Sequence, residues 1–364
     1  MKRGLKMAVV LSALLCLTGC GTKVTTAEEP VIATEHQEEV RQEETEQVSV
    51  TEEDALADKK IGISIFRYDD NFMNMFRREL ESYLVNQGFQ KENINMVDAR
   101  NDFDRQLDQV NTFIRQGTDL LIINPVDATQ ADVITDLAVA ADIPLIYINS
   151  APAQSEQHRW KQNGWRVTYC GTDLYEAGRY QGEMIADLGS DTLDKNHNGQ
   201  IDYIMLEGTM GHADTEYRTK YSVKTLRNAG YSLNCLMQES GEWSKEKGYD
   251  LTIQALETYG DDVEVILSNN DAMALGAIKA IEESGRIPGE DIYLVGVDAL
   301  PEAVEDVILG KMTGTVFNDY FSQSHNTVDA AIRYLTGEEN DYFIGCHYLK
   351  VTQENAMDVL DMVN

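Results

Sequence analysis

The chain has 364 residues, 43% of them hydrophobic, and a formal net charge of −32 at pH 7. Its length is sufficient for two domains, each with its own core. The strong negative charge argues against nucleic acids and anionic phosphate surfaces as partners.

The N-terminus has the features of a secretory signal. Basic residues at positions 2, 3 and 6 precede an apolar run over 7–17, which is too short to span a membrane as a mature helix. The run ends on Leu17-Thr-Gly-Cys20, which resembles a bacterial lipobox and so implies cleavage before Cys20 and lipid attachment to its sulfur. Ordinary secretion with small residues at the cleavage site is the alternative. We predict a signal peptide over 1–19 and lipidation of Cys20.

Residues 20–58 form an acidic segment with twelve acidic and two basic residues and no hydrophobic periodicity. Such a segment buries too little apolar surface to fold, so we predict a disordered, self-repelling tether. With the lipid at its start, the tether would hold the folded part at the extracellular face of the cell membrane. The remaining cysteines, Cys170, Cys235 and Cys346, are odd in number and widely spaced, unlike a disulfide framework or a zinc pattern. We expect them to be small buried hydrophobes.

From residue 59 onward, apolar strand-like runs alternate with amphipathic helical segments. In the first half, strands are predicted at 61–66, 120–124 and 143–149, with a helix over 71–85 and another between the second and third strands. In the second half, strands are predicted at 201–206, 263–268 and 292–297. Short strands separated by helices indicate βαβ units with parallel sheets. Two such series predict an α/β fold with two Rossmann-like, doubly wound lobes, whose ligands bind outside the carboxyl ends of the strands.

Polar and aromatic side chains stand where these strands end. Taken singly, each has a simple structural explanation. An Asx residue after a strand is commonly a helix N-cap worth about 1 kcal/mol, and Asp214 with Arg218 could form a surface ion pair on a helix that begins near residue 214. His212 could be a solvated loop residue, and the aromatics could be core residues. The N-cap explanation applies to Asp70, Asn149 and Asn318, and the core explanation to Phe72 and Trp243.

The number of hydrogen-bonding groups at one edge nevertheless points to a shared pocket, which Asn270 and Asp298 would complete. A neutral polyol suits such a pocket, because hydroxyls donate and accept while Asp accepts, Arg donates and Asn does both. The apolar C–H faces of a sugar ring can be covered by flat aromatics.

The segment Asp194–Asp202 begins a calcium-binding loop without completing it. Gly199 stands at the sharp turn, and Met205 replaces the bidentate Glu expected at the twelfth position. A thioether has no affinity for a hard cation. The segment is therefore either a metal-free turn or a calcium site completed by a carboxylate from elsewhere. The oxygen donors that the loop itself offers are the side chains of Asp194, Asn196, Asn198 and Asp202 and the backbone carbonyl of Gln200.

From about residue 60 to the C-terminus, the chain resembles the periplasmic glucose/galactose-binding proteins of ABC importers. The resemblance implies a sugar-binding subunit that takes glucose or galactose, or both, between its lobes, closes on it by hinge motion and delivers it to a permease. At the matching positions of this family, Phe72 and Trp243 would sandwich the ring. The other eight polar residues at the strand ends would hydrogen-bond the pyranose. The motifs that carry the resemblance are Tyr68–Met73, Gly211–Thr219, Asn269–Met273, Gly296–Ala303 and Gly314–Asp319.

The resemblance also implies a bound Ca²⁺, with Glu264 supplying the distant bidentate carboxylate. The family usually has Asp where Asn198 stands and Gln where Asp202 stands, so three carboxylates remain and we expect calcium to bind with altered affinity. Ser150, where the family has Lys, and Cys170, ahead of a crossover, are expected to lie outside the pocket.

The implied first lobe comprises 59–171 and 319–350, and the second lobe, which carries the calcium site, comprises 172–318 and 351–364. Three crossovers would join them near 171–173, 317–319 and 349–351. We expect a monomer. The alternatives are a binder of another monosaccharide, a sensor subunit for chemotaxis or a histidine kinase, a glycoside hydrolase using Asp214 and Asp298, and a repressor-like effector domain.

Overall fold

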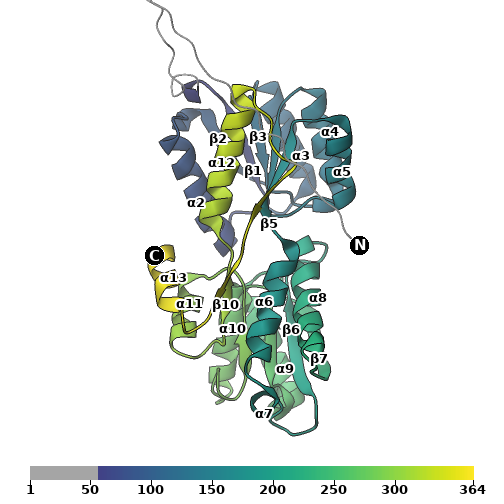
Figure 1. The fold of residues 1–364 in the computed structure, drawn as a ribbon, viewed down its shortest axis with the longest axis vertical. Helices are drawn as coiled ribbons and strands as arrows, with labels where there is room; N and C mark the ends of the chain where they lie inside the picture. Colours follow the sequence, from purple (N-terminus) through teal and green to yellow (C-terminus); the bar gives the residue numbers. More distant parts are fainter. Residues whose placement is uncertain (1–55) are drawn as a thin grey trace, which may run out of the picture. The chain divides into compact units, whose positions relative to one another are not determined.

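The computed structural model describes residues 56–364, and within this part no helix is long and apolar enough to cross a membrane. The predicted signal peptide, the lipidation site at Cys20 and nearly all of the acidic tether lie outside the described residues. The predicted α/β fold with parallel sheets is confirmed, and it comprises two lobes (Figure 1).

The first lobe is built on a six-stranded parallel sheet in the order β11-β5-β4-β3-β1-β2. Its strands are β1 (Ile61–Ile65), β2 (Ile94–Asp98), β3 (Leu120–Ile123), β4 (Leu145–Ile148), β5 (Val167–Thr172) and β11 (Phe343–Cys346). Its helices are α2 (Asn71–Asn86), α3 (Phe103–Arg115), α4 (Ala131–Ala140), α5 (Gln154–Asn163) and α12 (Tyr320–Thr336), with short 3-10 helices at Lys91–Asn93 and Ala128–Gln130.

Both faces of this sheet are buried, which explains why its central strands read as continuous apolar runs. In β3, Leu120 and Ile122 pack into the core that includes α2 and α12, whereas Leu121 and Ile123 pack into the core of α3, α4 and α5. Successive side chains of a strand point to opposite faces, so an uninterrupted aliphatic run fills both cores.

The second lobe has a four-stranded parallel sheet in the order β7-β6-β8-β9. Helices α6 and α8 pack together on one side, and α9 and α10 pack together on the other. The strands are β6 (Ile201–Glu207), β7 (Leu233–Ser240), β8 (Val265–Ser268) and β9 (Tyr293–Val295). The helices are α6 (Leu174–Ala186), α7 (Ser190–Leu193), α8 (Ala213–Asn228), α9 (Lys245–Tyr259), α10 (Asp271–Glu283), α11 (Pro301–Ile308) and α13 (Ala356–Val363), with a 3-10 helix at Gly260–Asp262.

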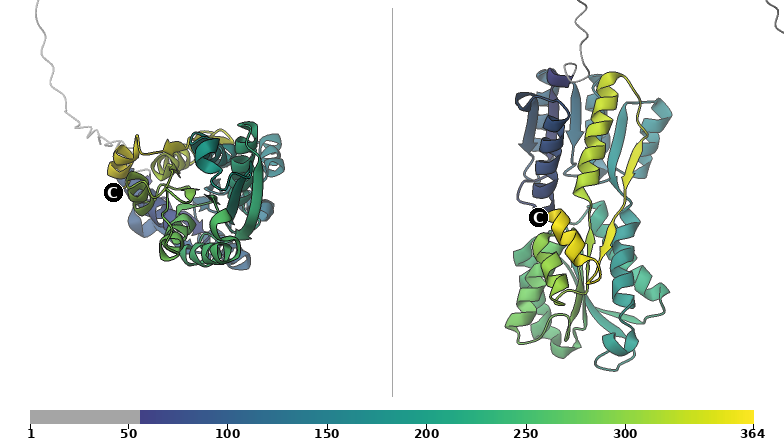
Figure 2. Two further views of the ribbon diagram at one scale, coloured as in Figure 1. Left: turned by 90° about the horizontal axis from the view of Figure 1, so that it is seen from below. Right: turned by 60° about the vertical axis from the view of Figure 1, so that its left-hand side comes forward.

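The chain passes between the lobes three times (Figures 1 and 2). It leaves β5 for α6 at 172–174, and it leaves β10 (Thr315–Phe317) for α12 at 318–319. It then leaves β11 after Cys346 and pairs with β10 as β12 (Leu349–Val351), in an antiparallel two-stranded sheet. The third crossing therefore lies at 347–348, slightly ahead of the predicted 349–351, because β12 already belongs to the second lobe.

Two features of the sequence were misinterpreted. Strands β2, β5, β7, β10, β11 and β12 were not predicted, and Cys235 was expected to be buried. It lies exposed on β7, which is an edge strand with several solvent-facing side chains, so the position does not require burial. Cys170 and Cys346 are buried as predicted.

Candidate functional site

The structure brings all ten predicted sugar-binding residues to one pocket between the lobes, hereafter the polar pocket. Its cavity volume is about 30 Å³, which corresponds to about one water molecule. The residues that line it are Phe66, Asp70, Phe72, Asn149, Ser150, His212, Asp214, Arg218, Trp243, Asn270, Asp298 and Asn318.

The first lobe contributes residues from the carboxyl ends of β1 and β4. Asp70 is the N-cap of α2, where its carboxylate accepts the N–H of Met73 at 2.8 Å. The N-cap explanation is therefore correct for Asp70, which leaves its second carboxylate oxygen free of that bond. The same explanation is wrong for Asn149 and Asn318, because Ala153 caps α5 and Asp319 caps α12.

The second lobe contributes the starts of α8 and α10. His212 occupies the N-cap position of α8 without a side-chain capping bond, whereas the Asn270 side chain caps α10. Asp214 and Arg218 lie one turn apart at the start of α8, and an Arg218 guanidinium nitrogen donates to Asp214 at 3.1 Å. This pair is buried on both sides and is not a surface ion pair.

Arg218 is the electrostatic centre of the polar pocket. Besides Asp214, it donates to the carbonyl of Asn269 at 2.9 Å and to the Tyr348 hydroxyl at 3.3 Å, and it lies 3.8 Å from the Asp298 carboxylate. Burial opposes its charge, but Tyr348, Asp214 and Asp298 together raise the pKa of Arg218 above its usual value. Its Nε is buried and has no partner among the described residues. An unpaired buried donor costs roughly 1–3 kcal/mol, so a hydrogen-bond acceptor that reached this atom would stabilise the site.

Two carboxylates of the polar pocket have raised pKa values. Burial raises the pKa of Asp298 well above its ordinary value, and Arg218 opposes this shift while Asp271 and Asp70 add to it. Burial likewise raises the pKa of Asp70, with the bond from Met73 acting in the opposite direction. Burial lowers the pKa of His212, which favours a neutral imidazole. Burial removes the water that would otherwise hydrogen-bond to these carboxylates, and hydroxyl groups of a ligand would take the place of that water.

Strained backbone is concentrated at the pocket. Asn149, Trp243 and Asp298 have φ values of 59°, 66° and 118°, in a region that residues with a side chain rarely occupy. Each such residue costs roughly 1–3 kcal/mol, and such strain persists mainly at functional sites.

Phe72 and Trp243 both line the polar pocket, and both also belong to the buried core. The Trp243 indole lies directly over Gly208: a Cβ at that glycine would come within 2.1 Å of the ring. The lack of a side chain at Gly208, directly after β6, therefore leaves the space that the indole occupies.

The sequence prediction missed two lining residues, Phe66 and Ser150. Ser150 was expected to lie outside the pocket, and this is wrong because it follows Asn149 into the same loop after β4. Arg67 was also missed. Its guanidinium donates to the Glu242 carbonyl at 3.2 Å and so links the loop after β1 to the loop after β7.

The structure also brings Glu264 against the loop at 194–202. Glu264 is fully buried just before β8, and its oxygens accept the N–H groups of Lys195, Asn196 and Asp202 at 2.7, 3.1 and 2.9 Å. Asp194 accepts from the N–H groups of Asn198 and Gly199, both at 3.0 Å. Glu264 thus lies against the loop as predicted and holds it by hydrogen bonds from its backbone N–H groups.

In the structure, the loop is held in its conformation by hydrogen bonds that nitrogen atoms donate. The side-chain amides of Asn196, Asn198 and Asn234 all donate to Asp202, and the Gln200 N–H donates to Asn198. No cluster of three or more His, Cys, Asp or Glu side chains placed to hold a metal is found within residues 56–364. Calcium prefers oxygen ligands, and this segment offers the carboxylates of Asp194, Asp202 and Glu264, each of which accepts hydrogen bonds from N–H or amide groups.

The comparisons with known proteins agree with this architecture. The model of the periplasmic binding protein domain matches residues 61–339. The D-galactose/methyl-galactoside binding periplasmic protein MglB of Haemophilus influenzae is 34% identical, covering 84% of this chain and 92% of that protein. The ribose import binding protein RbsB of Bacillus subtilis is 27% identical, covering 70% and 75%. A solved ABC transporter solute binding protein from Bacillus halodurans C-125, with bound myo-inositol, has a TM-score of 0.73 and 28% identity, covering 84% and 98%.

Proposed function

Because the chain belongs to the periplasmic binding protein family, we propose that it is the extracellular sugar-binding subunit of an ABC importer and that it binds glucose or galactose in the polar pocket. The relatives are named for sugar binding and import and are not enzymes. This argues against the hydrolase alternative, in which Asp214 and Asp298 would act as a catalytic pair.

The observation that carries the proposal is the unpartnered Nε of Arg218 among buried carboxylates from both lobes. Asp70, Asp214 and Asp298 outnumber Arg218, the one cationic side chain that lines the polar pocket within residues 56–364. A phosphate or a carboxylate ligand would be repelled, whereas hydroxyl groups can donate to the carboxylates and accept from the guanidinium. A neutral polyol therefore suits the buried carboxylates and the guanidinium together.

The choice of glucose or galactose rests on the motifs and on the galactose-binding relative. Other relatives are named for ribose, arabinose and myo-inositol, so another monosaccharide or polyol is the second candidate. Isothermal titration with glucose, galactose, ribose, arabinose and myo-inositol tests the proposal. We expect the two hexoses to bind at least tenfold tighter than the others, and no heat with either hexose would refute the assignment.

The small volume of the polar pocket bears on mechanism. A monosaccharide is many times larger than one water molecule, so it enters only if the lobes separate. Contacts to both lobes would then favour closure around the sugar, and the closed form would be read by the permease. A sensor subunit for chemotaxis or a histidine kinase would use the same motion.

We further propose that Cys20 carries a lipid that anchors the protein at the extracellular face of the membrane. The lipobox-like sequence and the acidic segment after it support this. A Cys20→Ala variant is expected to appear in the culture medium, whereas the parent chain remains in the membrane fraction. Equal distributions of the two would argue against the anchor.

We also propose that the loop at 194–202, completed by Glu264, binds Ca²⁺. The loop donors would be Asp194, Asn196, Asn198, Asp202 and the Gln200 carbonyl. Calcium should raise the melting temperature of the parent protein, and Glu264→Gln should abolish that rise while leaving sugar binding measurable. Identical melting of the parent protein in calcium and in chelator would overturn the metal proposal.

A further inference from the structure

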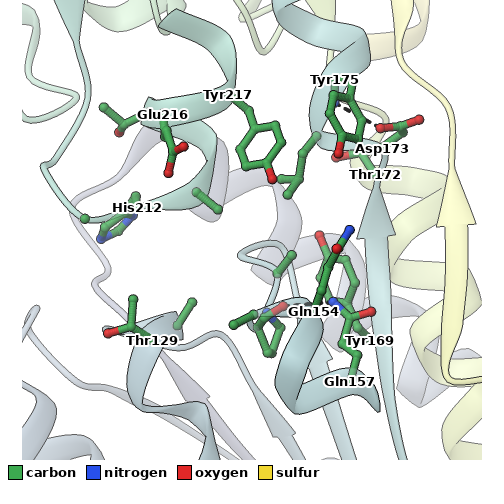
Figure 3. Close-up of a pocket in the computed structure, with 18 of the residues that line it drawn as sticks. Thr129, Gln154, Gln157, Tyr169, Thr172, Asp173, Tyr175, His212, Glu216 and Tyr217 are labelled. Carbon is green, nitrogen blue, oxygen red and sulfur yellow. Dashed lines mark hydrogen bonds between the residues drawn. The ribbon is translucent and has the colours of Figure 1, made fainter. Parts of the chain in front are cut away.

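A second cavity opens beside the polar pocket. It has a volume of about 850 Å³ and lies among residues of both lobes. Its first-lobe wall includes Thr129, Gln154 and Tyr169, and its second-lobe wall includes Tyr175 and Tyr217 (Figure 3). We call it the aromatic cavity. Its size lies within the range of about 300–1,000 Å³ that is usual for small-molecule sites.

The two cavities are neighbours in the fold, because His212 lines both. Asn149 and Ser150 line the polar pocket, and the next residues of the same loop, from Ala151 onward, line the aromatic cavity. The Tyr169 hydroxyl also donates to the Asn149 carbonyl at 2.7 Å, which ties the two walls together.

The lining of the aromatic cavity has the chemistry of a carbohydrate site. Tyr175 and Tyr217 meet edge-to-face with centroids 5.1 Å apart, and Tyr169 stacks on Phe343 at 5.6 Å. Such rings can cover the C–H faces of a sugar. Gln154 is exposed, and its side chain forms no hydrogen bond within the described part of the chain.

The charge of the lining excludes anions. Asp173, Glu207 and Glu216 contribute carboxylates, and no Lys or Arg of residues 56–364 lines the cavity. Burial lowers the pKa of His212, so the shared histidine adds no fixed positive charge. A uronic acid or a sugar phosphate would therefore be disfavoured, whereas a neutral ring would not.

We propose that the aromatic cavity holds the second ring of a neutral disaccharide whose first ring occupies the polar pocket. This rests on the proposed function of the polar pocket and extends its substrate class from monosaccharides to disaccharides. The monosaccharide leaves the aromatic cavity filled with water, and the second ring displaces that water against Tyr175 and Tyr217.

Calorimetry with the whole mature chain tests this. The probes are glucose, galactose, a panel of their disaccharides that differ in linkage, and a glucuronide. At least one disaccharide should bind as tightly as its monosaccharide or more tightly, and the glucuronide should bind more weakly. Tyr217→Ala should weaken that disaccharide roughly two- to tenfold without changing monosaccharide affinity.

Tyr249→Ala is the matched control, because Tyr249 is likewise a partly buried tyrosine on a second-lobe helix, α9, but does not line the cavity. It should leave both affinities unchanged. Gln154→Ala, an exposed change that does not threaten folding, provides a second test and should also weaken only the disaccharide. Monosaccharide binding without any disaccharide binding would overturn this inference and leave the proposed function intact. No binding of either class would overturn both.

Discussion

Replacement of Arg218 by Met is the most informative single perturbation of the polar pocket. Arg218 is 4% exposed, and its guanidinium lies 3.1 Å from Asp214 and 3.8 Å from Asp298. Methionine fills a similar volume but leaves two buried carboxylates without their cation. Breaking a buried pair in this way costs about 3–5 kcal/mol. We expect the free energy of unfolding to fall by that amount.

The same change should weaken sugar binding. A hydrogen bond to a charged group is worth about 1.5–3 kcal/mol, which corresponds to a roughly 10- to 150-fold loss of affinity. Denaturant unfolding followed by circular dichroism measures the first effect, and titration calorimetry with glucose and galactose measures the second. Calorimetry is done only at temperatures where the variant is folded.

Arg179→Met is the matched control. Arg179 also pairs with carboxylates on its own helix, including Glu183 at 2.8 Å, but its side chain is 43% exposed. Exposed pairs contribute about 0–1 kcal/mol, so this variant should be nearly as stable as the parent and should bind sugar normally. The reasoning would be refuted if Arg218→Met unfolded with the same free energy as Arg179→Met, or if its sugar affinity were unchanged.

The remaining predictions concern closure, pH and the indole. Small-angle scattering should show a smaller radius of gyration with glucose than without it, and an unchanged radius would count against hinge closure. Because the pKa values of Asp70 and Asp298 are raised, sugar affinity should fall as the pH falls through them, since the protonated carboxyls no longer accept as well. The contribution of the same two carboxyls to folding stability should instead fall as the pH rises, because the folded state holds protons that the unfolded state releases. Melting curves and sugar titrations across pH 4–7 should therefore show opposite trends, and trends of the same sign would contradict this reasoning. Gly208→Ala should displace Trp243 and weaken sugar binding while leaving calcium-dependent melting intact, which parallel calorimetry and melting curves would check.

The sequence predicted the strands that are buried on both faces, because these are uninterrupted aliphatic runs. Leu120–Ile123 and Leu145–Ile148 are examples, and both lie at the centre of the first sheet. Strand β5 is equally buried but is composed of Val, Thr, Tyr, Cys, Gly and Thr, so it lacks an aliphatic signature. Strand β7 lies at a sheet edge and is half exposed, so polar residues interrupt its apolar ones and no continuous aliphatic run appears in its sequence.

The pocket residues were predictable because parallel strands end at one edge and because five motifs occur in order. The resemblance could not reveal Ser150, since its position differs from the family pattern, and only the loop geometry after β4 turns it inward. Nor could it reveal Arg67, whose interlobe bond goes to a backbone carbonyl, a group that every residue carries. The positive φ values at the site could not be predicted from the sequence either, because Asn149, Trp243 and Asp298 are not glycines.

The arrangement of carboxylates supports the proposal that sugar binding is coupled to closure. Asp70 belongs to the first lobe and Asp298 to the second, and burial raises the pKa of each. The charge of Asp70 raises the pKa of Asp298 further. When the lobes approach without a sugar, two desolvated acids face one buried guanidinium that still has an unpartnered Nε. Closure is then opposed by the desolvation of the two acids and of that nitrogen. A ring that donates hydroxyls to both acids and accepts from Arg218 removes that opposition, so the ligand stabilises the closed state more than the open one, which is the condition for a population shift.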